Sequence, residues 1–138
     1  MRIFLSAPYA EWPTMQEYAH ELRGHGHTIS STWHIGNDAG KDDGTTITAS
    51  PAEQAVIAFG DLADLAQAQV YVGFPRSRGR GGTNVEYGYA LALGKLLVVV
   101  GQQPTVFHHL PQVRFCETWE DAKATLNRLR GDAKRYEE

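Results

Sequence analysis

The residues best suited to chemistry lie between positions 74 and 95, in the stretch FPRSRGRGGTNVEYGYALALGK. A strand-like segment ends there in a glycine-rich loop, and a helix-like segment begins near Thr83. Glu86 falls in the first turn of this predicted helix, where a carboxylate can stabilise positive charge at the anomeric carbon of a ribosyl group or bond to that carbon covalently. Glu86 also stands three residues after Thr83 and can instead complete a Thr-x-x-Glu capping box. The sequence leaves both interpretations open.

The loop before this helix is basic and rich in glycine. Backbone N–H groups at a helix start favour an anion, and guanidinium groups match phosphate oxygens. The stretch has neither the Gly-Lys-Ser/Thr of a P-loop nor the GxGxxG and downstream acid of a dinucleotide site. It therefore predicts a pocket for a substrate phosphate, with a soluble turn as the alternative. The residues of the predicted pocket are Arg76, Arg78, Arg80, Gly81, Gly82, Thr83 and Asn84.

Asp61 and Asp64 are candidates for a second carboxyl group near this loop. They stand one helical turn apart in the segment that precedes it. Gly60 comes directly before Asp61, although glycine costs about 1 kcal/mol relative to alanine inside a helix. Asp61 can protonate or hydrogen-bond a departing base, or both acids can be ordinary solvated helix residues. Tyr9 can hydrogen-bond the Glu86 carboxylate or serve only in packing.

Short apolar runs predict the strands that must position these groups. A β-branched, alternating segment at residues 27–33 predicts one more strand, followed by a polar loop over residues 36–50. The apolar runs are Arg2–Ser6, residues 70–74, Leu96–Val100 and Val113–Cys116.

Helical spacing predicts helices between these strands. The first begins at Thr14, which can pair with Glu17 in a capping box, and ends at Gly24. Two more cover residues 85–93 and 118–130, and Gly131 is expected to lie beyond the end of the last.

The helix that contains Asp61 has the strongest start signal in the chain. Ser50 is a good cap, Pro51 suits the first helical position, and Glu53 can complete a capping box. The spacing predicts one apolar face on this helix, made of Ala52, Ala55, Val56, Phe59, Leu62 and Ala66.

Strands without polar alternation, separated by helices, predict an α/β fold. We expect a single domain over residues 1–138: an open parallel sheet of about five strands with helices on both faces, flavodoxin- or Rossmann-like. Such sheets bind ligands at the carboxyl ends of their strands, which selects four loops, at residues 7–13, 33–50, 75–82 and 101–110.

Composition excludes several classes of function. The net charge of -3 over 138 residues argues against a nucleic-acid or membrane partner, since both need a broad cationic face. Cys116 is the single cysteine, so a disulfide within the chain and a thiolate metal cluster are excluded. The apolar runs are too short to span a membrane, and we expect a soluble cytoplasmic protein.

The sequence resembles the nucleoside 2-deoxyribosyltransferase-like superfamily, which includes 2'-deoxynucleoside 5'-phosphate N-hydrolases. The segments that carry the resemblance are RIFLSAPY, DLADLAQAQVYVGF and, most specifically, VEYGYALALGKLLVVV. The resemblance implies that Glu86 is the catalytic carboxylate, that Asp61 assists at the base or the sugar, and that Tyr9 positions Glu86. It also implies that Ser6 and Ala7 line the pocket and that no metal or organic cofactor is needed.

One departure from the family bears on the substrate. The nucleoside transferases carry an aspartate six residues before the catalytic glutamate, and this chain has Arg80 there. The sequence therefore favours an N-glycosidase that acts on a (deoxy)nucleoside 5'-monophosphate, with deoxyribosyl transfer to a second base as a further outcome. The alternatives are a non-catalytic nucleotide-binding or signalling module and an NAD glycohydrolase. Apolar residues 107–110 indicate a homodimer.

Overall fold

The computed structural model describes residues 1–35, 49–77 and 81–137. Within these residues, five strands form one parallel sheet in the order β2-β1-β3-β4-β5. This is the flavodoxin-like strand order, so the predicted fold class is confirmed. The strands are β1 (Arg2–Ser6), β2 (Thr28–Ile29), β3 (Val70–Gly73), β4 (Leu96–Val100) and β5 (Val113–Cys116).

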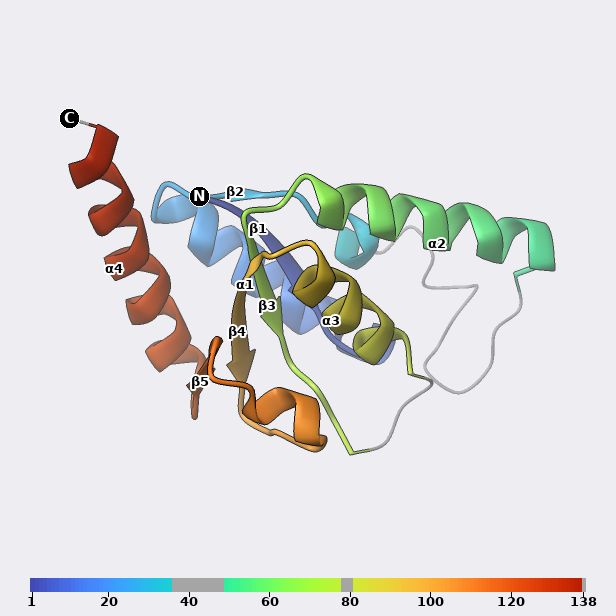
Figure 1. Ribbon diagram of the computed structural model, residues 1–138. Helices are drawn as coiled ribbons and strands as arrows, with labels where there is room; N and C mark the ends of the chain where they lie inside the picture. Colours follow the sequence, from blue (N-terminus) through green and yellow to red (C-terminus); the bar gives the residue numbers. More distant parts are fainter. Residues whose placement is uncertain (36–48, 78–80, 138) are drawn as a thin grey trace.

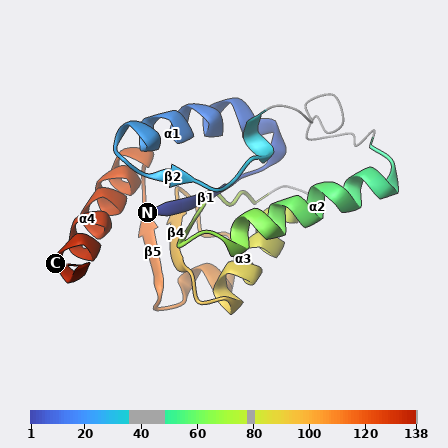
Figure 2. The ribbon, with the colours of Figure 1, turned by 90° about the horizontal axis from the view of Figure 1, so that it is seen from above.

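Four α-helices cover the two faces of the sheet (Figures 1 and 2). On one face α1 (Trp12–Gly24) meets α4 (Trp119–Glu137), where the Trp119 indole and the Lys123 amine both donate to the Glu21 carboxylate. On the other face α2 (Pro51–Ala66) lies beside α3 (Gly82–Ala92). Short 3-10 helices η1 (Tyr9–Glu11), η2 (Trp33–Ile35) and η3 (Val106–His109) follow β1, β2 and β4.

The core lies around the three central strands. Every residue of β3 is buried, and so is every residue of β1 and β4 except the first. Apolar runs of this kind are typical of parallel strands that are covered on both faces. The ends of these strands nearest the site are therefore rigid supports for the residues that follow them.

The second strand is shorter than the sequence predicts. Residues 27–33 were expected to be extended, but pairing stops at Ile29. Beyond that point side chains replace the backbone ladder, because Ser31 Oγ accepts the Leu5 N–H and Trp33 Nε1 donates to the Leu5 carbonyl. The chain can then turn into η2 while the polar groups of β1 stay paired.

Two helix boundaries also differ from the prediction. Helix α1 begins at Trp12, before Thr14, with Pro13 in its first turn. Helix α4 continues through Gly131 to Glu137, because one glycine in an exposed helix costs only about 1 kcal/mol among good helix formers. The start of α2 is confirmed, since Ser50 and Glu53 form the predicted capping box.

The predicted apolar face of α2 is largely exposed. Of the helix's residues, all of them described, Leu65 alone is buried, while Val56 and Phe59 are 72% and 79% exposed. The helix extends beyond the sheet, so its first turns have no strand beneath them (Figure 1).

Candidate active site

The carboxyl end of β1 meets the first turns of α3 at Ser6 and Glu86. The Ser6 hydroxyl, fully buried at the last position of β1, donates a hydrogen bond of 2.7 Å to Glu86 Oε1. Glu86 itself is half-buried. The carboxyl group therefore lies at the sheet edge where open parallel sheets bind ligands.

The start of α3 excludes the capping-box interpretation of Glu86. The cap residue is Gly81, whose φ of 89° lies in the left-handed region that glycine tolerates, and α3 begins at Gly82. Thr83 lies inside the helix. Among the described residues, no side chain caps the start of α3. Glu86 is therefore not the second half of a capping box, and its carboxyl group is held by Ser6 instead.

Burial dominates the ionisation of Glu86. It raises the pKa of Glu86 from 4.5 to about 8, because the carboxylate loses most of its contact with water. The Ser6 hydrogen bond acts in the opposite direction, since it favours the charged form. The negative charge of Asp61 raises the pKa further. A carboxyl group with this pKa is protonated in roughly nine molecules of ten at pH 7.

The structure brings Asp61 to Glu86 and gives Asp64 a different partner. Asp61 is half-buried on α2, and its charge acts on Glu86. Asp64 Oδ2 accepts a hydrogen bond of 2.6 Å from the Thr32 hydroxyl, which ties α2 to the segment before η2. Asp64 thus ties two segments together, whereas Asp61 is the candidate acid whose charge acts on Glu86. The role of Asp61 in a reaction stays a prediction.

Sequence reasoning missed Tyr71, a buried residue with a polar hydroxyl group that lies beneath Glu86. Tyr71 is buried in β3, and its hydroxyl donates a hydrogen bond of 3.3 Å to the Thr83 carbonyl. The Ser6 hydroxyl acts on the phenol oxygen as a donor and lowers the pKa of Tyr71. Burial and the Glu86 charge both raise the pKa of Tyr71. The sequence of the strand is apolar apart from this phenol. A phenol hydroxyl in a strand that is covered on both faces needs a polar hydrogen-bond partner. That requirement is the signal that could have found it.

Other predicted residues lie around the end of β1. Ala7 is buried directly after Ser6, and Tyr9 lies in η1 with its ring centroid 6.0 Å from that of Trp33. Trp33 is buried and hydrogen-bonded to Leu5, so it acts as a packing residue. His34 is fully buried between Ser31 and Gln16, and burial lowers its pKa to about 4.

The arginine loop is only partly described. Arg76 forms an ion pair of 2.8 Å with Glu11 of η1. Arg78 and Arg80 lie outside the described residues. Gly81, Gly82, Thr83 and Asn84 form the start of α3. The phosphate pocket predicted from these residues stays a prediction.

The segment after β4 is held by a separate set of bonds. Buried His108 contacts the Thr105 hydroxyl, and Gln103 donates to the His108 carbonyl. The Tyr87 hydroxyl of α3 donates to the Phe107 carbonyl, which fixes η3 against α3. In the parts of the chain that the structure describes, no three His, Cys, Asp or Glu residues gather as a metal site. No helix there is long and apolar enough to cross a membrane.

No protein-family model matches the sequence, and no curated protein matches it. Solved structures do match in fold. The CMP N-glycosidase BcmB from Clostridium botulinum is 16% identical with a TM-score of 0.53, over 92% of this chain and 98% of that one. A 2-deoxyribosyltransferase from Bacillus psychrosaccharolyticus is 19% identical with a TM-score of 0.63, over 89% and 90% of the two chains. BlsM, solved in solution, is 17% identical with a TM-score of 0.60, over 91% and 86%. The chain thus has the fold that the resemblance implied, that of nucleoside 2-deoxyribosyltransferase-like proteins.

Proposed function

We propose that this protein is an N-glycosidase that cleaves the base–sugar bond of a (deoxy)nucleoside 5'-monophosphate. The observation that carries the proposal is the half-buried Glu86 carboxyl group at the carboxyl edge of the sheet, with Asp61 near enough to influence its charge. The fold shared with a CMP N-glycosidase and a 2-deoxyribosyltransferase supports the same chemistry.

The reaction follows from the two carboxyl groups. Ionised Glu86 attacks the anomeric carbon, the bond from that carbon to the base nitrogen breaks, and Asp61 supplies the proton that the departing base takes up. Water then cleaves the glycosyl ester, so that nucleotide and water give free base and a sugar 5-phosphate. If a second base replaces water, the result is deoxyribosyl transfer. The chemistry needs no metal or organic cofactor.

The two acids do not ionise independently, because a carboxylate on Asp61 disfavours a second one on Glu86. The reaction proceeds from the form in which Glu86 is ionised and Asp61 carries the proton. Arg76, with Arg78, Arg80 and residues 81–84, is proposed to hold the 5'-phosphate.

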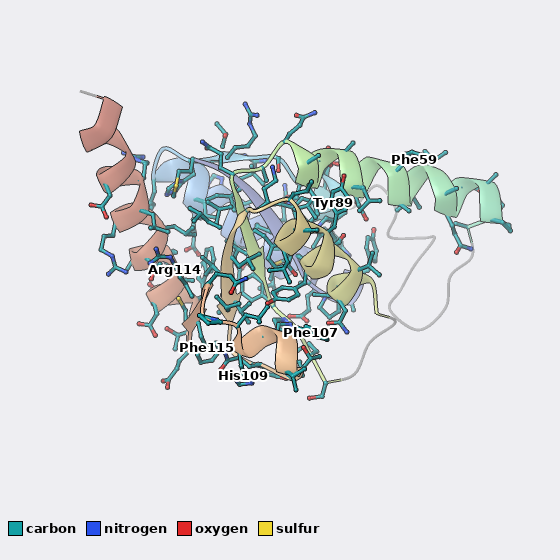
Figure 3. The ribbon with its side chains drawn as sticks, viewed as in Figure 1. Phe59, Tyr89, Phe107, His109, Arg114 and Phe115 are labelled. Carbon is teal, nitrogen blue, oxygen red and sulfur yellow. The ribbon has the colours of Figure 1, made fainter. Side chains whose placement is uncertain are left out.

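The exposed face of α2 supports a homodimer. Val56 and Phe59 on α2 and Val85 on the neighbouring α3 are each more than 60% exposed. No charged residue interrupts α2 between Glu53 and Asp61, so two copies can pair this surface around a twofold axis without opposed like charges. Figure 3 shows Phe59 on this outer helix. We place the protein in the cytoplasm, as a soluble enzyme.

The test is release of free base. The purified protein is incubated with ribo- and deoxyribonucleoside monophosphates, the matching nucleosides and NAD, and the products are separated by chromatography beside those of Glu86→Gln. Base released from monophosphates alone, and lost in the variant, is the expected result. Stoichiometric nucleotide binding without base release would instead identify a binding module. Nicotinamide released from NAD alone would identify an NAD glycohydrolase, and unchanged turnover in the variant would overturn the role of Glu86.

A further inference from the structure

Ser6, Gly73 and Tyr71 form a layer of the sheet directly beneath Glu86. Ser6 of β1 pairs in register with Gly73 of β3. Tyr71 stands two residues before Gly73, on the same face of the strand. A Cβ on Gly73 would lie only 2.6 Å from the Tyr71 hydroxyl oxygen. The Tyr71 ring therefore lies over the glycine and brings its hydroxyl beside Ser6.

The hydroxyl groups of this layer connect to the Glu86 carboxyl group. Ser6 donates to Glu86 Oε1, and the Tyr71 hydroxyl donates to the Thr83 carbonyl of α3. A serine hydroxyl has one hydrogen to donate. Ser6 also lowers the pKa of Tyr71, as a donor to the phenol oxygen does, so Tyr71 competes with Glu86 for the one hydrogen of Ser6.

We propose that Ser6 is a positioning residue that holds the Glu86 carboxylate ready for attack. The inference rests on the proposed function, in which Glu86 reacts in its ionised form. The described residues provide Glu86 with one hydrogen-bond donor, Ser6, in surroundings that otherwise oppose the charged form. Two titratable groups interact with Glu86 there. The charge of Asp61 of α2 raises the pKa of Glu86, and the charge of Glu86 raises the pKa of Tyr71 of β3.

The inference gives a pH dependence with a definite sign. The Ser6 hydrogen bond favours ionised Glu86, so its loss moves the titration of Glu86 to higher pH. An enzyme that lacks Ser6 should therefore be impaired where Glu86 is mainly protonated and should recover where it is fully ionised. A purely structural defect would lower activity by the same factor at every pH.

The experiment measures kcat/KM against pH, between pH 6 and 10, for wild type, Ser6→Ala, Tyr71→Phe and the double variant. Ser6→Ala is expected to lose about tenfold at pH 7 and to regain most of that loss above pH 9. Tyr71→Phe removes the competitor for the Ser6 hydrogen and is expected to shift the profile slightly to lower pH. The double variant should match Ser6→Ala, because Tyr71 acts on Glu86 through the hydroxyl that is already missing. Tyr87→Phe is the matched control, since it removes a neighbouring hydroxyl that bonds to Phe107 rather than to Ser6, and its profile should not shift.

A second readout keeps this inference separate from the proposed function. The side-chain carboxyl signal of ¹³C-labelled Glu86, assigned by its absence in Glu86→Gln, is titrated by NMR in the same variants. If the wild type releases no base, the proposed function fails, but a rise in the Glu86 midpoint on loss of Ser6 still supports the positioning role. An unmoved midpoint in Ser6→Ala, or a shift in Tyr71→Phe that persists in the double variant, would overturn it.

Discussion

The phenol oxygen of Tyr71 occupies the space in which a side chain on Gly73 would begin, 2.6 Å from the position of its Cβ. Two ring carbons of Tyr71 lie at 2.5 and 2.8 Å from the same point. The absence of a side chain at position 73 is thus what allows a tyrosine at position 71 to fold back toward Ser6. The position of Tyr71 beneath the proposed site therefore depends on Gly73, which has no side chain of its own.

Gly73→Ala should therefore displace Tyr71 and destabilise the fold. The ring is buried on all sides, so the added methyl group cannot be accommodated by a small rotation, and we expect a loss of about 1–3 kcal/mol in the free energy of unfolding. Urea unfolding of wild type and Gly73→Ala measures this loss. Gly88→Ala is the control, because Gly88 lies within α3 with no atom near its missing Cβ, and alanine there should be neutral or stabilising. Equal effects at the two positions would contradict the contact with Tyr71.

The sequence predicts the parts of this molecule that local patterns determine. Leu96–Val100 is apolar throughout and forms β4 with those bounds, and Ser50, Pro51 and Glu53 build the predicted helix start. The location of the site where the chain leaves β1 and β3 follows from the rule that ligand sites lie at the carboxyl ends of parallel strands. These features need no knowledge of distant contacts.

The rest depends on contacts between distant parts of the chain. Ser6 and Glu86 are 80 residues apart, and no local pattern indicates that one donates to the other. Strand β2 ends early because side chains at positions 31 and 33 bind the backbone of Leu5. In the sequence, Tyr71 is indistinguishable from the apolar residues of a buried strand. The contacts of its hydroxyl group become known only from the structure. The exposure of the apolar face of α2 could not be predicted from the sequence either. Periodicity shows that a helix face is apolar, but it does not show what packs against that face.

We expect ionisation of Glu86 to lower the free energy of unfolding as the pH rises. Its pKa rises from 4.5 to about 8 on folding, so the folded state binds a proton that the unfolded state has lost between these values. Stability is then highest below pH 4.5 and falls as the pH rises toward 8. Glu86→Gln removes the ionisation and should be more stable than wild type by about 4 kcal/mol at pH 8. Near pH 5 the difference should be small.

Urea unfolding of both proteins between pH 5 and pH 9 tests this expectation. Gln keeps the size of the side chain and a carbonyl oxygen for Ser6, so the comparison isolates the charge. A wild type whose stability is independent of pH relative to the variant would show that Glu86 is not buried as described. In base-release assays the same variant should be slower by about a thousandfold or more, since it lacks the attacking oxygen.

Asp61→Asn should separate the two roles of Asp61. Removal of its charge lowers the pKa of Glu86, so the acid limb of the kcat/KM profile moves to lower pH. Removal of its proton slows the departure of a base by about 100- to 10,000-fold. A sugar phosphate with a 4-nitrophenolate leaving group needs no such proton and should be cleaved by the variant nearly as fast as by wild type. A loss of the same size on both substrates would contradict a general-acid role.

Phe59→Glu should convert the proposed dimer into a monomer. Phe59 is 79% exposed near the middle of the uncharged face of α2, so a carboxylate there would have to be desolvated against its symmetry mate. Phe115→Glu is the matched control, because Phe115 is 39% exposed on β5, on the far side of the molecule from Phe59 (Figure 3). Sedimentation velocity is expected to show a dimer for wild type and the control and a monomer for Phe59→Glu. A monomeric wild type, or a dimer that only Phe115→Glu dissociates, would show that the α2 face is not the interface.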